Sequence, residues 1–207
     1  YEIGSVGTVM PDVEVKIGEN NEILLRGKTI TTGYYKKPEA TAAAIDRDGW
    51  FHTGDAGYLK DSHLYLTERI KDLFKTSNGK YISPQALETK LAIDRYIDQI
   101  AVIADERKFV SALIVPVYGF VKDYAKEKGI AYSNMDELLQ HPKIQALFRA
   151  RIDTLQQQFA HYEQVKRFTL LTEPFSMERG ELTNTLKLKR SVVAKNYKEV
   201  IDKMYEE

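Results

Sequence analysis

The first third of the chain contains two short stretches that alternate apolar and polar residues, 13–17 and 63–67, a pattern typical of β-strands with one buried face. A short apolar run at 22–26 predicts a further strand, paired in a hairpin with the first. Turn signals precede two of these three stretches, Asn20-Asn21 and Asp61-Ser62. A short helix is expected from Pro38, since proline is favoured in the first turn of a helix. We predict a small β-barrel or sandwich over residues 1–70.

The rest of the chain mixes strand and helix patterns. Ser83-Pro84 is a helix start signal, and the apolar periodicity predicts helices at 83–92, 120–128, 144–159 and 192–205. Shorter apolar runs predict strands at 99–104, 110–115 and 168–171. The composition shifts near Lys71, so we expect an α+β protein with a β-rich subdomain at 1–70 and an α+β domain at 71–207.

Composition and charge narrow the function classes. Of 207 residues, 43% are apolar and 29% charged, as in a folded protein. Thirty Lys and Arg balance thirty Asp and Glu, so no basic field indicates a nucleic-acid partner. No apolar run approaches the length of a membrane-spanning helix. There is no cysteine, and the four histidines lack metal-site spacing, so we expect no protein-held metal.

The chain starts with Tyr1 and has no signal peptide, which suggests a fragment entered mid-domain, with a trimmed tag as the alternative. The missing cysteines are consistent with a reducing cytoplasm. We therefore expect a cytoplasmic location and allow for membrane association of the full-length protein.

Asp55 and Arg69 are candidates for holding a nucleotide sugar. Asp55 follows Thr53-Gly54 in an expected tight turn, and its two carboxylate oxygens suit the vicinal hydroxyls of a ribose. On composition alone, an aspartate that caps a turn is the favoured interpretation. The planar fork of Arg69 could assist, or could form a surface ion pair with Glu68 or Asp72.

Two polar loops could also carry chemistry. Residues 76–80, Thr-Ser-Asn-Gly-Lys, lack the spacing of a phosphate-binding P-loop and are more typical of an ordinary left-handed turn. The stretch 182–190 carries Lys187, Lys189 and Arg190. A charge run of this kind is usually a solvated face. The functional alternative is a mobile loop that presents one ammonium group to a developing negative charge.

Four segments in order resemble motifs of AMP-forming acyl-CoA synthetases, a branch of the adenylate-forming superfamily, and the resemblance covers essentially the whole chain. The segments are Glu22-Ile-Leu-Leu-Arg-Gly with Gly33-Tyr-Tyr, Thr53-Gly-Asp, Arg69-Ile-Lys-Asp-Leu-Phe-Lys with Gly79, and Thr185-Leu-Lys-Leu-Lys-Arg. Glu68 and Leu186 stand where many relatives have glycine. Both variants, and the last string itself, resemble the long-chain fatty acyl branch.

The resemblance implies a role for each matching residue. Asp55 would hold the ribose hydroxyls of ATP, and Arg69 would assist. Lys71, with Asp72, would form the hinge between the end of a large N-terminal domain and a mobile C-terminal domain. Lys187 would bridge the carboxylate and the α-phosphate. The residues expected to face the site in a second, CoA-accepting orientation are Lys75, Ser77, Asn78, Gly79 and Lys80.

The implied reaction joins a fatty acid to ATP with Mg²⁺, forming acyl-AMP and pyrophosphate; CoA then displaces AMP. The implied partners are the fatty acid, ATP, CoA and an N-terminal adenylation domain in cis. Two alternatives stay open at this point. One is a non-catalytic module that binds a nucleotide or a partner, and the other is a ligase branch for aryl, amino or luciferin-type acids.

Overall fold

The computed structural model describes residues 2–206 and divides the chain into two compact units. The first unit runs to Leu73, and the second begins at Phe74. The boundary between the two units thus lies three residues after the one expected from composition. Each unit is described by itself.

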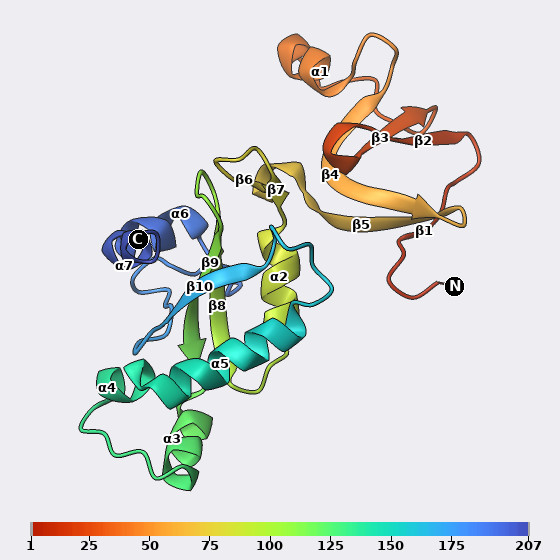
Figure 1. Cartoon of the computed structure of the whole chain (residues 1–207). Helices are drawn as coiled ribbons and strands as arrows, with labels where there is room; N and C mark the ends of the chain where they lie inside the picture. Colours follow the sequence, from red (N-terminus) through yellow and green to blue (C-terminus); the bar gives the residue numbers. More distant parts are fainter. Residues whose placement is uncertain (1, 207) are drawn as a thin grey trace. The chain divides into compact units, whose positions relative to one another are not determined.

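The first unit is built on one antiparallel sheet of five strands in the order β1-β5-β4-β3-β2 (Figure 1). The strands are β1 (Gly7–Thr8), β2 (Val13–Ile17), β3 (Glu22–Gly27), β4 (Phe51–Lys60) and β5 (His63–Arg69). A short helix, α1 (Pro38–Ala44), lies in the connection between β3 and β4, and the 3₁₀ turn η2 (Ile70–Asp72) follows β5. The three predicted strands and the predicted helix are all present.

The predicted turns are confirmed, but the prediction of a barrel or sandwich is wrong, because the described strands of the first unit form one sheet. Asn20, Asn21, Asp61 and Ser62 all have positive φ, which asparagine and aspartate tolerate better than most residues. They close the β2–β3 and β4–β5 hairpins. The sheet stays open because its edge strands β1 and β2 pair only with β5 and β3 among the described residues. A two-residue β1 offers too little backbone to close a barrel.

The second unit is a three-layer arrangement around a sheet of order β10-β9-β8. Strands β8 (Ile97–Ile103) and β9 (Val110–Pro116) are antiparallel, whereas β10 (Val165–Leu170) runs parallel to β9. Central β9 is buried at every position, and this explains a sequence that is apolar except for Ser111. A separate two-stranded ribbon joins β6 (Phe74–Lys75) to β7 (Tyr81–Ile82).

Both faces of this sheet are covered because alternate strand residues point to opposite sides. Ile100, Val102 and Ile114 pack with α2 (Pro84–Leu91), α3 (Tyr118–Glu127), α4 (Met135–Gln140) and α5 (Pro142–Leu155). Leu113 and Val115 pack on the other face against α6 (Arg190–Asn196) and α7 (Lys198–Lys203) (Figure 1).

The helix predictions need three corrections. Helix α4 was not predicted, although Asn134 caps it by accepting from the Glu137 N–H at 2.9 Å. Helix α5 ends at Leu155, four residues before the predicted end, because the Gln156 side chain turns to the backbone of Val165. The single helix expected over 192–205 is broken at Tyr197, whose ring packs edge-on against Phe175.

No helix within residues 2–206 combines the length and the apolar character that crossing a membrane requires.

Candidate functional site

Asp55 lies in a bulge within strand β4, not in the tight turn that the sequence predicted. Gly54 has φ of 71°, and the pairing of β3 with β4 shifts register around it. The hydroxyl of Thr53 donates to the Ile23 carbonyl at 2.7 Å and accepts from the Asp55 N–H at 3.1 Å. The bulge re-aims a side chain in mid-strand, as bulges near functional sites often do.

Glu22 on the neighbouring strand β3 and His52 within β4 support this bulge, and sequence reasoning gave neither a role at the ribose site. The Glu22 carboxylate accepts from the Gly54 N–H at 3.0 Å and lies 2.9 Å from the Nδ1 atom of His52. Both side chains are partly buried. His52 is therefore a polar, hydrogen-bonded histidine that supports the loop beside Asp55.

The structure brings Asp55 and Arg69 together across the β4–β5 hairpin. They are direct partners in the register, and Arg69 Nε lies 3.4 Å from Asp55 Oδ1. Arg69 thus pairs with Asp55, in addition to whatever contacts its neighbours in the chain make. Their side chains are 75% and 36% exposed, so the ion pair itself adds little stability. Both groups remain available to a polar ligand.

The expected hinge residues Lys71 and Asp72 lie in η2, just before the start of the second unit. Both are exposed, and the preceding Arg69 and following Leu73 have extended backbone. A short exposed 3₁₀ turn between two compact units presents few packing contacts that would oppose a change of backbone dihedrals.

The loop 76–80 is the tip of the β6–β7 ribbon, and the predicted left-handed turn falls at Gly79, with φ of 73°. Buried Thr76 organises the loop by donating to the Lys80 carbonyl at 3.1 Å and accepting its N–H at the same distance. Around it the predicted residues are all exposed: Lys75, Ser77, Asn78, Gly79 and Lys80. They form one polar surface on a fixed backbone.

Lys187 lies in a small hairpin that runs from Leu182 to Leu188, two residues that pair as an antiparallel bridge. Thr183 N–H donates to the Lys187 carbonyl at 2.8 Å, and its hydroxyl accepts the Lys187 N–H at 3.0 Å. The Lys187 side chain is exposed and takes part in no ion pair among residues 2–206. The hairpin thus presents a free ammonium group to the exterior.

The charge run that contains Lys187 is only partly a solvated face. Lys187 and Lys189 are exposed, but Arg190 is partly buried and paired with Glu88. Leu186, in the position where many relatives have glycine, has φ of 59° and is exposed. A bulky residue in this left-handed region is strained, which shows that the hairpin geometry is imposed by its surroundings.

A buried carboxylate that sequence reasoning missed holds one stem of this hairpin. Glu181 is 1% exposed, and it accepts from Arg179, Asn196 and the Ser176 N–H. Its own carbonyl accepts the Lys189 N–H at 2.8 Å. Burial raises the pKa of the Glu181 carboxyl, but these hydrogen bonds more than offset burial, and the pKa lies below its ordinary value.

Replacing Glu181 by glutamine is expected to destabilise the protein by roughly 1–3 kcal/mol at pH 7, the range for a lost buried charged hydrogen bond. Because the folded-state pKa is lowered, the ionised carboxylate stabilises the fold above the unfolded pKa. That contribution disappears as pH falls through the folded value. Urea unfolding at pH 7 and again below pH of about 4 measures both effects.

Glu173 provides the matched control, since it also pairs with Arg179 but its side chain is 73% exposed. Glu173→Gln should cost less than about 1 kcal/mol. A Glu181→Gln deficit that stayed constant down to the acidic range would contradict the ionised state assigned here.

No group of three or more His, Cys, Asp or Glu side chains within residues 2–206 is arranged to hold a metal ion. In the first unit, the carboxylate of Asp55 and the guanidinium of Arg69 lie together, and such a pair suits the hydroxyl groups of a sugar. In the second unit, the exposed ammonium group of Lys187 on its anchored hairpin suits a negatively charged group.

Comparison with known proteins assigns the class. Residues 71–207 match the AMP-binding enzyme C-terminal domain, and the chain belongs to this family. It is 35% identical to the peroxisomal long chain acyl-CoA synthetase 7 of Arabidopsis thaliana, over 99% of this chain and 32% of that protein. It is 32% identical to the long-chain-fatty-acid–CoA ligase FadD15 of Mycobacterium tuberculosis, over 99% of this chain and 34% of that protein.

Solved structures agree on the fold. The adenylation domain of a carboxylate reductase from Mycobacterium chelonae superposes with a TM-score of 0.70 at 26% identity, over 96% of this chain and 32% of that chain. The present chain spans about a third of the length of the curated relatives it matches.

Proposed function

We propose that this chain forms the C-terminal part of an ATP-dependent long-chain-fatty-acid–CoA ligase. The observation that carries the proposal is its similarity, over 99% of its length, to long-chain acyl-CoA synthetases from plants and mycobacteria. In the reaction, a fatty carboxylate oxygen attacks the α-phosphorus of ATP and pyrophosphate leaves. The CoA thiolate then attacks the acyl carbonyl carbon, and AMP leaves with the carboxylate oxygen.

The first unit contributes the ribose contact in this proposal. Asp55 accepts hydrogen bonds from the two ribose hydroxyls, and Arg69 donates to the ribose oxygens or orients the carboxylate. Support comes from the pair's geometry, with the two groups 3.4 Å apart on a bulged hairpin. Mg²⁺ enters with ATP, coordinated by its phosphates, as this ion usually does.

The second unit contributes Lys187 to the first half-reaction. Two anions must approach there, and like charges about 4 Å apart repel by about 4 kcal/mol at an effective dielectric constant near 20. An ammonium between them offsets this repulsion and follows the charge as it develops. The side chain of Lys187 supports the assignment, since it is exposed and forms no ion pair with any residue that the structure describes.

The two half-reactions need different groups at the reacting atoms, because Lys187 must leave before CoA enters. We propose that Lys71 and Asp72 act as the hinge for this exchange. The polar loop with Lys75, Ser77, Asn78, Gly79 and Lys80 then faces the CoA side. This assignment is supported by the hydrogen bonds between Thr76 and Lys80, which fix the loop backbone and keep these five exposed residues together.

The proposal includes an N-terminal adenylation domain in cis. Among residues 2–73, the apolar side chains that are well buried are Ile23, Leu24 and Ala56 alone. Large apolar side chains are exposed instead on its sheet, among them Tyr58 and Leu66. An apolar surface of this kind suits a covering domain. We also infer a cytoplasmic location with peripheral membrane contact, because a long-chain fatty acid partitions into bilayers.

The test is CoA-dependent release of AMP by the complete protein, supplied in turn with palmitate, acetate and benzoate. Palmitate should exceed acetate in kcat/KM by at least about 100-fold, since a few bound methylenes of about 0.8 kcal/mol each account for that ratio. A preference for benzoate would instead indicate a ligase of another branch. Failure to release AMP from any acid would indicate a non-catalytic module.

A further inference from the structure

A two-pronged ion pair joins the segment after Lys187 to the core of the second unit. Arg190, three residues after Lys187, places Nη1 2.5 Å and Nη2 2.6 Å from the two carboxylate oxygens of Glu88 on α2. Glu88 also accepts the N–H of Val102 in β8 at 2.8 Å. One carboxylate therefore connects α2, β8 and the start of α6.

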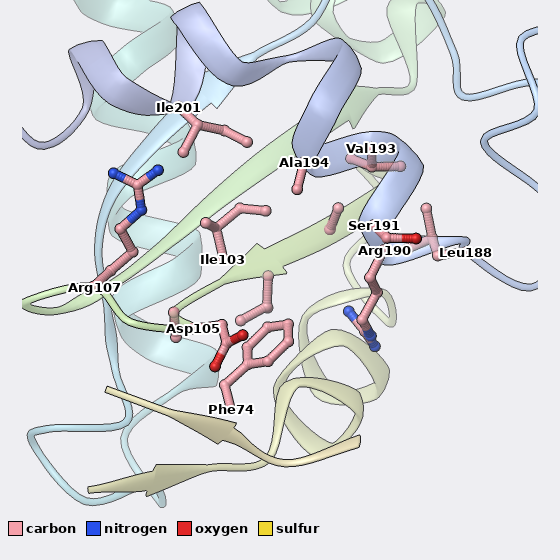
Figure 2. A pocket seen from close by; sticks show the side chains of 13 residues that line it. Phe74, Ile103, Asp105, Arg107, Leu188, Arg190, Ser191, Val193, Ala194 and Ile201 are labelled. Carbon is pink, nitrogen blue, oxygen red and sulfur yellow. The ribbon is translucent and has the colours of Figure 1, made fainter. Parts of the chain in front are cut away.

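Packing alone does not fix Arg190, because its side chain borders a cavity of about 300 Å³. Figure 2 shows this cavity between the strands and α6, with Arg190 and Arg107 at opposite ends and Phe74 beside it. The guanidinium of Arg190 lies 5.6 Å from the Phe74 ring centre. With open space on one flank, the paired hydrogen bonds to Glu88 hold the side chain in place.

The Lys187 hairpin thus has an anchor on each stem. Glu181, buried and fully hydrogen-bonded, holds the stem through its carbonyl bond to the Lys189 N–H. Arg190 holds the chain immediately after Lys189. Between the anchors, the left-handed Leu186 is a strained position that relaxes if the stems are released.

We propose that Arg190 and Glu88 are positioning residues that fix the Lys187 hairpin, and through it the direction of the Lys187 ammonium group, for acyl-adenylate formation. The catalytic part of this inference rests on the proposed function. The structural part concerns the order of the hairpin and stands separately. Neither residue touches the reacting atoms in this assignment.

The chain offers a closely matched control pair, Arg151 with Asp94. Arg151 lies 2.7 Å from the Asp94 carboxylate, which also accepts a backbone N–H, that of Tyr96 at 2.9 Å. Its guanidinium likewise lies over an aromatic ring, that of Tyr96, at 4.7 Å. The pair connects α5 to the loop before β8, and neither residue belongs to the hairpin. Its loss should affect stability alone.

The first readout is the rate of each half-reaction in the complete protein. Arg190→Met should slow acyl-adenylate formation from palmitate and ATP by about 10- to 100-fold, the effect of a displacement of about 1 Å. Thioester formation from supplied palmitoyl-adenylate should change less than about threefold. Arg151→Met should slow neither step selectively. Equal loss in both steps for Arg190→Met would overturn the positioning role.

A double variant guards against misfolding. Arg190→Met combined with Glu88→Gln removes the charges together and keeps an acceptor for the Val102 N–H, so the fold should tolerate it. It should reproduce the selective loss in adenylation. Arg190→Lys keeps the charge but not the two-pronged geometry, and should lie between wild type and Arg190→Met.

The second readout is hydrogen exchange at the hairpin amides of Thr183, Lys187 and Lys189. Exchange should accelerate about tenfold or more in Arg190→Met and in the double variant, but not in Arg151→Met. Unchanged exchange would overturn the inference. Faster exchange in a protein whose adenylation does not depend on Lys187 would uphold the anchoring and refute the role proposed for Lys187, and absence of any AMP release would refute the ligase function, so the failures are distinguishable.

Discussion

Replacing Lys187 by alanine is expected to slow acyl-adenylate formation by about 10²–10³-fold, the usual cost of removing one preorganised charge-stabilising contact. Thioester formation from supplied acyl-adenylate should stay within about threefold of wild type, because the ammonium group has no role once pyrophosphate has left. Pyrophosphate exchange with ATP measures the first step, and CoA-thioester formation from palmitoyl-adenylate measures the second.

Lys189→Ala is the matched control for this prediction. Lys189 is also exposed on the same segment, and its structural contact is made by its backbone N–H, which the substitution keeps. It should leave both half-reactions near wild type. If Lys187→Ala slowed both steps equally, the assignment of Lys187 to the first step alone would be wrong.

The stability of Lys187→Ala should match wild type within about 0.5 kcal/mol, since the side chain is exposed and forms no ion pair among residues 2–206. A kinetic loss without a stability loss separates chemistry from folding. This distinguishes Lys187 from Glu181, whose replacement acts through the fold.

Sequence patterns predicted strands and helices correctly where local signals alone determined the structure. Strand β2 alternates cleanly, and the turns before β3 and β5 contain residues that accept positive φ. Helix α2 begins at Ser83-Pro84 as expected, with the Ser83 hydroxyl accepting the Ala86 N–H. In each case, the local signal and the tertiary packing favour the same conformation.

Predictions from local sequence patterns were wrong where contacts with residues distant in the chain determine the backbone conformation. The break at Tyr197 depends on Phe175 and on the bond from Asn196 to Glu181, neither of which is visible in a helical periodicity. The bulge at Gly54 likewise depends on the Glu22 carboxylate, about thirty positions earlier in the chain. A glycine between polar residues is consistent with a turn or a bulge, and only the strand partner distinguishes them.

The candidate site was accessible to sequence reasoning to different degrees. Asp55 and Lys187 stand in recognisable motifs, so both could be named as candidates from the sequence. The supporting carboxylates Glu22, Glu88 and Glu181 resemble ordinary surface residues in a sequence with 30 acidic residues. Their burial and partners appear only when the sheet and the helices are assembled.

Replacing Asp55 by alanine is expected to raise the KM for ATP by about 100-fold in the complete protein. Hydrogen bonds to a charged acceptor contribute about 1.5–3 kcal/mol each, and partial exposure reduces the sum for two ribose hydroxyls to about 2.7 kcal/mol. The first unit should remain folded, since Asp55 forms only an exposed ion pair there. Initial rates over a range of ATP concentrations give the KM.

Substrate analogues sharpen the measurement. Wild type should discriminate against 2′-deoxy-ATP and 3′-deoxy-ATP, whereas Asp55→Ala should use ATP and these analogues with nearly equal kcat/KM. A double-mutant cycle then gives the interaction free energy between the Asp55 side chain and each hydroxyl. The substitution is the first change in the cycle, and the deoxy analogue is the second. Asp48→Ala, which removes an exposed carboxylate elsewhere in the same unit, should preserve the discrimination.

Arg69→Ala separates the two roles open to Asp55. If Asp55 mattered only because it orients Arg69, removing either partner would raise the KM equally, since both variants lose the same 3.4 Å contact. If Asp55 binds the ribose itself, Arg69→Ala should have the smaller effect, about tenfold or less, and should keep discrimination against the deoxy analogues. Equal loss of discrimination in both variants would refute direct ribose binding by Asp55.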